Sequence, residues 1–204
     1  MMKKILCSIF AASLMLLGTS AYAQLAVGAG YVNSKQTLKT SPTTFSAPTN
    51  GFSAGLEYNV PVGDFFGMSA GVNFEYLMSK SYSLAVVSGD FREQYINVPV
   101  HLNVGFPLAD GIRLFAFAGP TFSYALSGKV SVGSASYDVY KTESYNRFDV
   151  LVGGGAGLDL MNKIRLQVGY DLGMFNKFPK NHDGSEATTK LNRNQLYAGI
   201  AFLF

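Results

Sequence analysis

The sequence has a single cysteine, Cys7, and no tryptophan. Because Cys7 lies in the amino-terminal apolar run, the rest of the chain has no disulfide, no thiol nucleophile and no thiolate ligand for a metal. Charge is also scarce, since Asp, Glu, Lys and Arg make up only 14% of the residues. After the amino-terminal run, no apolar segment approaches the roughly 18 residues that a spanning helix needs. A membrane protein with this sequence must therefore cross the bilayer as strands.

The amino terminus has the three parts of a secretory signal peptide. Two lysines at positions 3 and 4 precede an apolar run that begins at Ile5, and Ala21-Tyr22-Ala23 forms an A-x-A cleavage site. Cys7 lies too far before these small residues to be acylated as in a lipoprotein. We expect residues 1–23 to be the signal peptide and residues 24–204 to form one exported domain.

Cleavage at this site leaves a nearly neutral chain. Removing Lys3 and Lys4 reduces the 16 Lys and Arg residues to 14, against 13 Asp and Glu. A nucleic-acid-binding domain usually has a strongly basic surface. We therefore expect no nucleic acid among the partners.

Eight segments of the remaining chain alternate apolar with polar or small residues, which is the period of two that a strand presents to its two faces. They are residues 24–33, 51–60, 66–79, 96–106, 112–126, 148–160, 164–174 and 195–204. Between them, the long connections 34–49, 80–94, 127–146 and 176–193 alternate with the short ones 61–65, 107–111 and 161–163. That rhythm is typical of outer-membrane barrels, which have short periplasmic turns and longer outer loops. We predict an all-β fold, an eight-stranded antiparallel up-and-down transmembrane barrel with both termini in the periplasm.

The two faces of these strands differ in composition. From the second strand onward, one face carries no charge, and it places Tyr and Phe toward many strand ends, as membrane girdles would. The other face combines many glycines with charged residues, namely Glu57, Glu75, Arg113, Asp149, Asp159, Arg165 and Asp171. A soluble lipocalin or sandwich also has an apolar and a polar face, but charges and glycines are poor material for a dry core. We therefore expect the apolar face to contact outer-membrane lipid and the charged face to line the lumen.

The spacing of the charges from the turns predicts two levels in the lumen. Glu57, Arg113 and Arg165 lie near the short turns, and Glu57 should bind one of the two arginines across the lumen, because an unpaired buried charge costs several kcal/mol. Farther along the barrel lies an acidic level of Glu75, Asp149 and Asp171, beside which Arg147 is the basic residue that we expect. Water or a cation would reach this level.

The aromatic residues Phe115 and Phe117 share a strand face with Arg113, so we expect them to point inward and to fill the space between the two levels. Eight strands enclose a lumen that side chains just fill, whereas open channels generally need about sixteen. The sequence therefore predicts a plugged barrel without steady ionic conductance.

Two features interrupt the strand patterns. Pro99 cannot donate to a strand ladder, so we expect a bulge there. Gly153, Gly155 and Gly157 have the density of a phosphate loop, but neither a helix nor a GK[ST] sequence follows them. We expect these glycines to mark close packing and sharp curvature.

The last strand ends in the pattern Tyr197-x-Gly199-x-x-Phe202-x-Phe204. This pattern resembles the terminal signal by which the barrel-assembly machinery of Gram-negative bacteria takes up its substrates. The resemblance implies that this machinery is a partner of the chain. A strand of this kind is also suited to closing a barrel against its first strand.

Several motifs of the strands resemble, in order, those of the PorT-like family of small outer-membrane β-barrels. They are YINVPV at 95–100, AGP at 118–120, Phe148-Asp149 followed by Gly155-x-Gly157, and Gly169-Tyr170-x-x-Gly173. The resemblance covers nearly all of residues 24–204 and implies an eight-stranded barrel of the OmpX/OmpA size class. The namesake of the family is linked to protein secretion across the outer membrane, but no motif carries that role to this chain.

The two histidines are the candidates for catalysis. Outer-membrane lipid A deacylases and proteases use His with Ser or an acid to activate a hydroxyl or a water, and only composition supports that combination here. We expect His101 to be a hydrogen-bonded lumen residue and His182 a solvated loop residue. His182 and Asp183 alone make no metal site, which needs three or four ligands. We therefore predict no enzymatic activity, no catalytic residue, no cofactor and no metal.

The remaining functions are structural or adhesive. The outer loop 127–146 alternates with a Gly-Ser break, which predicts a hairpin above the membrane. Its residues Tyr137, Tyr140 and Tyr145 are of a type enriched at interfaces, so this loop is the candidate contact surface for a ligand. We expect a monomeric barrel with this role. The alternatives are a small passive pore and an accessory component of outer-membrane protein secretion.

Overall fold

The structure is a computed structural model that describes residues 24–40, 43–84, 87–132, 135–142, 145–178 and 190–204. The predicted signal peptide with Cys7 lies outside these residues, as do His182 and Asp183. No helix in the described part of the chain is long and apolar enough to cross a membrane.

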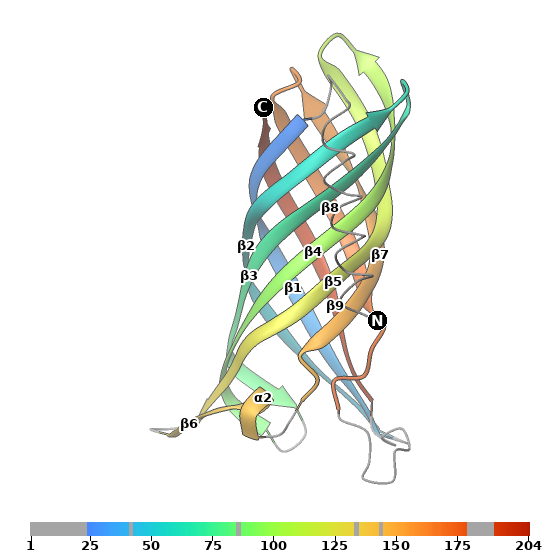
Figure 1. The fold of residues 1–204 in the computed structure, drawn as a ribbon. Coiled ribbons are helices and arrows are strands. Elements are labelled where there is room, and N and C mark those ends of the chain that lie inside the picture. The colour runs from blue at the N-terminus through green and yellow to red at the C-terminus, as the bar shows by residue number, and fades with distance from the viewer. Residues whose placement is uncertain (1–23, 41–42, 85–86, 133–134, 143–144, 179–189) are drawn as a thin grey trace, which may run out of the picture.

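The described residues form an antiparallel sheet that closes into a barrel (Figure 1). The elements are β1 (Gln24–Thr40), β2 (Thr43–Val62), β3 (Phe66–Leu84), β4 (Val87–Ala109), β5 (Ile112–Val132), β6 (Ala135–Asp138), α2 (Val139–Thr142), β7 (Phe148–Leu160), β8 (Ile164–Gly173) and β9 (Lys190–Leu203). Eight strands make the ring, in which each pairs with its neighbours and β1 pairs with β9, while β6, among the described residues, pairs with β5 alone. The predicted eight-stranded antiparallel barrel is confirmed.

The last strand closes the ring along its whole length. Ala26 of β1 lies opposite Leu203 of β9, and the pairing continues to Lys39 and Lys190. At the end of the chain, the backbone N–H of Phe204 donates to the carbonyl of Leu25 at 2.8 Å. Closure of this kind leaves no strand edge in the ring, so backbone donors and acceptors are satisfied without water.

The two ends of the barrel differ. The start of β1 and the carboxyl terminus lie at the end that also carries the three short turns, which we call the short-turn end (Figure 1). Each of these turns contains residues of positive φ: Gly63 (77°), Gly111 (72°), and the pair Met161 (53°) and Asn162 (54°). Positive φ at both central residues suits the twist of a two-stranded hairpin. Helix α2 and strand β6 lie at the opposite end, the long-loop end.

The strands are longer than the sequence predicted. Strands β2, β3, β4 and β5 have 20, 19, 23 and 21 residues, about twice the 9–11 that cross a bilayer. Most of the predicted connections 34–49 and 80–94 is therefore strand, and this expectation was wrong. The Ser/Thr-rich composition indicated loops, but inward residues of the first stretch, including Gln36, Leu38 and Ala47, are buried.

The third long connection, 127–146, forms the predicted hairpin. β5 continues to Val132, and β6 pairs back on it from Lys129 opposite Asp138 to Val132 opposite Ala135. A register shift places Ser127 opposite Gln94 and Ala125 opposite Tyr95, which leaves Leu126 as an extra residue. After this bulge the inward positions of β5 are even, so that Val130 is buried.

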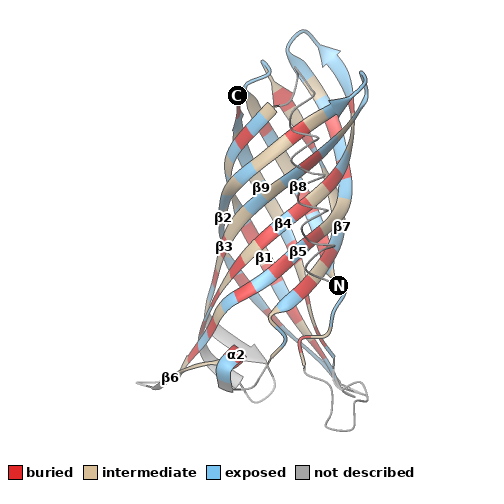
Figure 2. Ribbon diagram, viewed as in Figure 1, coloured by how far each residue is buried: buried red, intermediate tan, exposed pale blue. Residues whose placement is uncertain are grey.

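Exposed residues alternate with buried ones along the strands (Figure 2), and in a band between the short-turn end and Tyr31 the exposed residues are mostly large and apolar. Aromatic residues gather at the two edges of this apolar band. One edge carries Tyr31, Phe52, Tyr76, Tyr124 and Phe148, which neighbouring strands hold in register, and the short-turn edge carries Phe65, Phe66, Phe106, Phe202 and Phe204. The arrangement matches the aromatic girdles of barrels that sit in membranes.

Strand β5 faces as predicted, with Phe115 and Phe117 buried in the lumen. Their rings lie where side chains at Gly157 and Gly155 would stand, because a Cβ atom at these glycines would be 2.5 Å and 2.6 Å from the rings. These two glycines thus allow the close packing that we expected.

The prediction of a β-bulge at Pro99 was wrong, since β4 has the same register with β3 on either side of this residue. The shifts lie instead at Ser79/Tyr82, Gln94/Tyr95 and Pro107/Ala109.

Candidate functional site: the closed lumen

A cluster of charges closes the lumen near the short-turn end, with Arg165 of β8 at its centre. Its guanidinium donates to both carboxylate oxygens of Asp159 at 2.7 Å and 3.0 Å, a bidentate pair. It also donates to Glu57 at 3.1 Å and to Asn59 at 2.6 Å, across the lumen on β2. The hairpin between β7 and β8 places Asp159 directly opposite Arg165, so the pair is built by local register.

Arg113 belongs to the same cluster. It lies opposite Asp159 on the neighbouring strand and pairs with that carboxylate at 3.6 Å. Of the two arginines expected to bind Glu57, Arg165 does so and Arg113 does not. The ring of Phe115 covers the other side, 4.5 Å from the Arg165 guanidinium carbon. Outside this cluster, a cavity of about 300 Å³ opens beside Gln24, with Arg113 in its wall.

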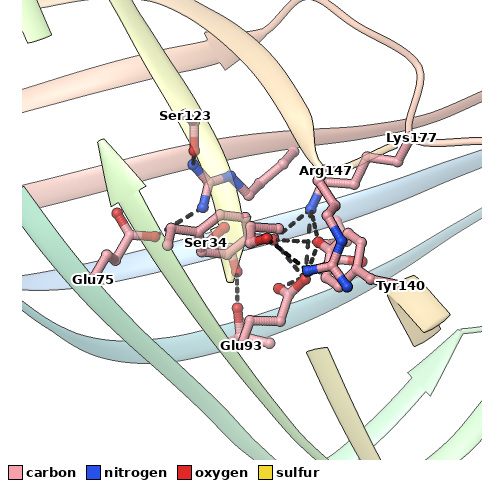
Figure 3. Close-up of polar contacts among 12 residues, drawn as sticks. Ser34, Glu75, Glu93, Ser123, Tyr140, Arg147 and Lys177 are labelled. Atoms are coloured by element: carbon pink, nitrogen blue, oxygen red, sulfur yellow. Dashed lines mark hydrogen bonds and ion pairs between the residues drawn. The ribbon is translucent and has the colours of Figure 1, made fainter. Parts of the chain in front are cut away.

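A second cluster closes the lumen toward the long-loop end, around Arg193 of β9; its partners Glu75 and Ser123 are labelled in Figure 3. The Arg193 guanidinium donates to Glu75 at 2.9 Å and to the Ser123 hydroxyl at 3.1 Å. Asn97 joins the same partners, since its amide donates to Glu75 at 2.9 Å and accepts from Ser123 at 2.6 Å. The ring of Tyr95 stacks on the guanidinium at 3.9 Å. Arg193 has no exposed surface, so its partners enclose it completely.

The prediction that Arg147 lies beside the acids Glu75, Asp149 and Asp171 was wrong. Arg147 donates to the backbone carbonyls of Ala125 and Leu126 at 3.0 Å and 2.9 Å, because it precedes β7 and points to the rim of β5. Arg193 occupies the place that we predicted for Arg147. Its role was missed because β9 begins at Lys190, within the stretch interpreted as a loop.

The other two acids of this level have weaker partners. Asp149 accepts from the backbone N–H of Phe175 at 3.2 Å, and Asp171 accepts from the Gln195 amide at 3.1 Å. Neither carboxylate forms an ion pair with a residue that the structure describes, and each keeps one oxygen without a hydrogen bond.

A third cluster lies beyond Arg193 and contains Lys177, which follows β8 and is buried (Figure 3). The Lys177 ammonium donates to the hydroxyls of Tyr95 at 2.5 Å and Tyr140 at 3.2 Å, and it lies 3.5 Å from Glu93. Glu93 also accepts from Tyr95 at 2.5 Å, from Tyr140 at 3.0 Å and from Gln36 at 2.6 Å. One buried ion pair thus connects β1, β4, α2 and the segment after β8.

Burial and charge set the proton affinities of the two members that lie outside the strands. Burial lowers the pKa of the Lys177 ammonium, although Glu93 acts in the opposite direction. Burial raises the pKa of the Tyr140 hydroxyl well above its ordinary value, and the Glu93 carboxylate raises it further. The Tyr140 hydroxyl therefore stays protonated and can donate to Glu93.

Backbone bonds fix the segment that carries Lys177. Its N–H donates to the carbonyl of Leu191 at 2.9 Å, and its carbonyl accepts from Asn146 at 2.8 Å. The Asn146 side chain donates to the carbonyls of Asn176 and Phe178, both at 3.1 Å. The residues before β7, after β8 and at the start of β9 are therefore held together over the mouth.

An apolar core surrounds the third cluster, inside the part of the barrel beyond the aromatic edge. Its buried members are Val32, Leu38, Ala47, Leu77, Phe91, Tyr95, Ala125, Val130, Val139, Tyr140 and Leu191. Tyr140, which we expected on a contact surface, is 6% exposed and faces this core. Tyr137 and Tyr145 pack against the core and are partly buried. In residues 32–38 burial alternates, but positions 33–37 are all polar, so the sequence carries no apolar alternation that could have indicated this extension.

Between the two arginine clusters lies a polar cavity of about 90 Å³. His101 lines it, stacks on Phe117 at 5.1 Å, and its Nε2 atom has no hydrogen-bond partner among the described residues. His101 thus lies in the lumen, as predicted, but its Nε2 atom does not make the hydrogen bond that we expected. No group of three or more His, Cys, Asp or Glu side chains that could hold a metal ion occurs in the described ranges.

The residues of the terminal pattern divide between the two faces of β9. Tyr197 points into the lumen, where its ring lies 6.5 Å from that of Phe117, and Gly199 lines the polar cavity. Phe202 and Phe204 are exposed on the outward face. The role of this pattern in assembly stays a prediction.

Known proteins share this architecture. A family model described as outer membrane protein beta-barrel domain matches residues 18–178. Outer membrane protein OprG of Pseudomonas aeruginosa has a TM-score of 0.50 at 10% identity, over 92% of this chain and 98% of its own. Neisserial surface protein A (NspA) has a TM-score of 0.49 at 16% identity, over 88% and 97%. Ail, the attachment invasion locus protein of Yersinia pestis, has a TM-score of 0.44 at 14% identity, over 89% and 99%.

At these identities, the likeness to solved structures shows the fold alone. Among curated protein sequences, none matches this chain. The family match is broader than the PorT-like resemblance, which stays a prediction. Because that match spans most of the barrel, the chain belongs to the family of outer membrane protein beta-barrel domains and is a small outer-membrane β-barrel protein.

Proposed function

We propose that this protein is a non-enzymatic outer-membrane barrel whose lumen is closed by side chains and whose long-loop end serves a structural or adhesive role at the cell surface. In this proposal the short-turn end and both termini face the periplasm. The single observation that carries it is the closure of the lumen at three successive levels, centred on Arg165, Arg193 and Lys177.

Closure argues against the pore alternative. An ion that crosses the lumen would have to separate Arg165 from Asp159 and Glu57, and then Arg193 from Glu75. Separating a buried pair leaves uncompensated charges, which costs about 3–5 kcal/mol. Two such barriers in series oppose steady conduction.

The surroundings of His101 support the non-enzymatic part of the proposal. A general base needs its substrate and an orienting partner within hydrogen-bond reach. His101 instead lies against the ring of Phe117 inside the barrel, between the clusters of Arg165 and Arg193. A lipid or peptide substrate has no evident route to it through these clusters.

Planar bilayer recording tests the closed lumen. The purified protein, inserted into a bilayer, should show no steady conductance steps under conditions in which a sixteen-stranded porin gives them. Membrane insertion is checked independently by heat-modifiable migration of the reconstituted protein. Large, stable channels from the wild-type protein would reject the closed lumen and favour the pore.

The hairpin of β5 and β6 supports the adhesive part of the proposal. It projects at the long-loop end, beside α2 (Figure 1). Within the described residues β6 pairs with β5 alone, so its other edge could accept a strand from a partner. At its base, Tyr140 is held by Glu93 and Lys177. A hairpin with a fixed base loses little entropy when it binds a partner.

Removing residues 131–136 tests this role. Cells that display this variant should lose most of their binding to surfaces coated with extracellular-matrix glycoproteins, relative to cells with the wild-type protein. Met161→Ser is the matched control, since Met161 is exposed in a turn at the opposite end. Unchanged binding of the shortened variant, at equal surface expression, would reject the hairpin as the contact surface.

A further inference from the structure

The outward face of β1 changes from apolar to polar at Tyr31. The Tyr31 hydroxyl donates to the side-chain oxygen of Asn50 at 2.5 Å, and the Asn33 amide donates to the same oxygen at 2.7 Å. Leu25 and Val27 are exposed on the short-turn side of Tyr31, whereas the residues that β1 exposes on the other side are lysines. A tyrosine between an apolar and a polar surface marks the level of the lipid headgroups, because its ring suits lipid and its hydroxyl suits water.

The lysines Lys35 and Lys39 lie on this face, beyond Tyr31. A strand rises about 3.3 Å per residue, so the Cα atom of Lys35 lies about 13 Å from that of Tyr31 along β1, and its long side chain can reach back toward the headgroups. Lys39 lies farther out, directly opposite Lys190 of β9, and both are exposed. Like charges directly opposite each other on two strands repel. We call Lys35, Lys39 and Lys190 the lysine patch.

Acidic side chains do not balance the lysine patch within the described residues. Beyond the aromatic edge, the described parts of β1, β2 and β9 contain no Asp or Glu, and neither lysine of β1 forms an ion pair with a described residue. The opposite side of the barrel differs. Arg92 of β4 lies opposite Lys129 of β5 there, but Asp138 of β6 also lies opposite Lys129, and Asp90 is exposed on β4. The lysine patch thus carries uncompensated positive charge, whereas the opposite side is close to neutral.

We propose that the lysine patch binds the phosphate groups of a lipid headgroup in the membrane leaflet at the long-loop end. Phosphate supplies the charge that the patch lacks, and a lysine ammonium binds it as a point charge. Lys35 and Lys39 lie about 13 Å apart along the strand, so a headgroup with a phosphate at each end of its sugars meets both. Only the assignment of this leaflet to the cell surface rests on the proposed function.

Native mass spectrometry of the purified protein in detergent micelles tests the patch. The probe is lipid A with both of its phosphate groups, and the reference is lipid A from which both have been removed. The wild type should retain the phosphorylated lipid and release the reference. Binding should weaken about 25-fold in the double variant Lys35→Gln with Lys39→Gln, since each lysine near an anionic surface contributes about fivefold to affinity. Added salt should also weaken binding, because it screens exposed charges.

The double variant Arg92→Gln with Lys129→Gln is the matched control. It removes the same amount of charge from the opposite side of the barrel, so it should bind the phosphorylated lipid nearly as the wild type does. All four substituted side chains are exposed, so both variants should fold, and heat-modifiable migration checks this.

Equal binding of the two lipids by the wild type would overturn the proposal, as would equal weakening in both double variants. Displacement of the lipid by an equal concentration of inorganic phosphate would also overturn it and assign the patch to a free anion. Binding in micelles depends on neither the closed lumen nor the hairpin of β5 and β6. Its failure would therefore leave the planar bilayer result unaffected, and a steady conductance would reject the closed lumen without affecting lipid binding.

Discussion

The two halves of the lumen both contain buried charges, but they neutralise these charges in different ways. At the short-turn end, Arg113 and Arg165 meet Asp159 and Glu57 in equal number, and strand register places both arginines opposite Asp159. Toward the long-loop end, Glu75 binds Arg193, which lies 118 positions away in the sequence. Asp149 and Asp171 have no ion-pair partner there among the described residues. The first half has a shared network, and the second depends on single pairs.

Loss of one cation should therefore cost more in the second half. We expect Arg193→Met to reduce the free energy of unfolding by about 3–5 kcal/mol, because Glu75 is left buried without a countercharge. Urea titration of the barrel in lipid vesicles measures this change. The double variant Glu75→Gln with Arg193→Met should recover most of the loss, since no charge is then left unpaired. If the double variant is as unstable as the single one, packing and not charge is the cause.

The matching substitution in the first half should have a smaller effect. Arg165→Met leaves Arg113 beside Asp159 at 3.6 Å, and the Glu57 side chain is 18% exposed and can recruit water. We expect a loss of about 1–3 kcal/mol, the cost of leaving hydrogen-bonding groups unsatisfied. The same urea titration applies. A reduction in the free energy of unfolding equal to that of Arg193→Met would show that the shared network protects the barrel no better than a single ion pair.

The sequence predicted the first half better than the second, for a physical reason. Alternation of residues in the membrane-crossing strands assigned Glu57, Arg113 and Arg165 to the inward face, and short turns placed them at one level. The cations of the second half, Arg193 and Lys177, lie in a stretch that we interpreted as a loop. Neither strand register nor turn spacing could then relate them to Glu75 and Glu93.

The length of the strands was underestimated for a related reason. The part of the barrel that extends beyond the membrane needs no apolar outward face. Exposed residues there, such as Lys35 and Lys39, therefore interrupt the alternation that lipid contact requires. The inward positions give no apolar pattern either, because buried Ser34 and Gln36 lie between Val32 and Leu38. The tyrosines of the hairpin were likewise assigned by residue type alone. Only the bulge at Leu126 and the turn into α2 direct Tyr140 inward.

The smallest effect that we expect concerns this inward tyrosine. Tyr140→Phe removes a donor to Glu93 at 3.0 Å and an acceptor from Lys177 at 3.2 Å. Glu93 keeps its bonds from Tyr95 and Gln36, so the loss at neutral pH should be about 1 kcal/mol.

The pH dependence identifies the hydroxyl as the cause. In the folded protein the pKa of Tyr140 is raised, whereas in the unfolded chain a tyrosine loses its proton near pH 10. Above about pH 10 the folded state thus holds the proton that the unfolded state has lost, and stability falls as pH rises. Urea titrations between pH 8 and 11 should show a smaller alkaline decline for Tyr140→Phe than for the wild type. Tyr124→Phe, on the outward face, is the control and should decline as the wild type does. If the stability of Tyr140→Phe declined with pH in parallel with that of the wild type, the Tyr140 hydroxyl would not be kept protonated by its place beside Glu93. The third closing level would then depend on Lys177 and Tyr95 alone.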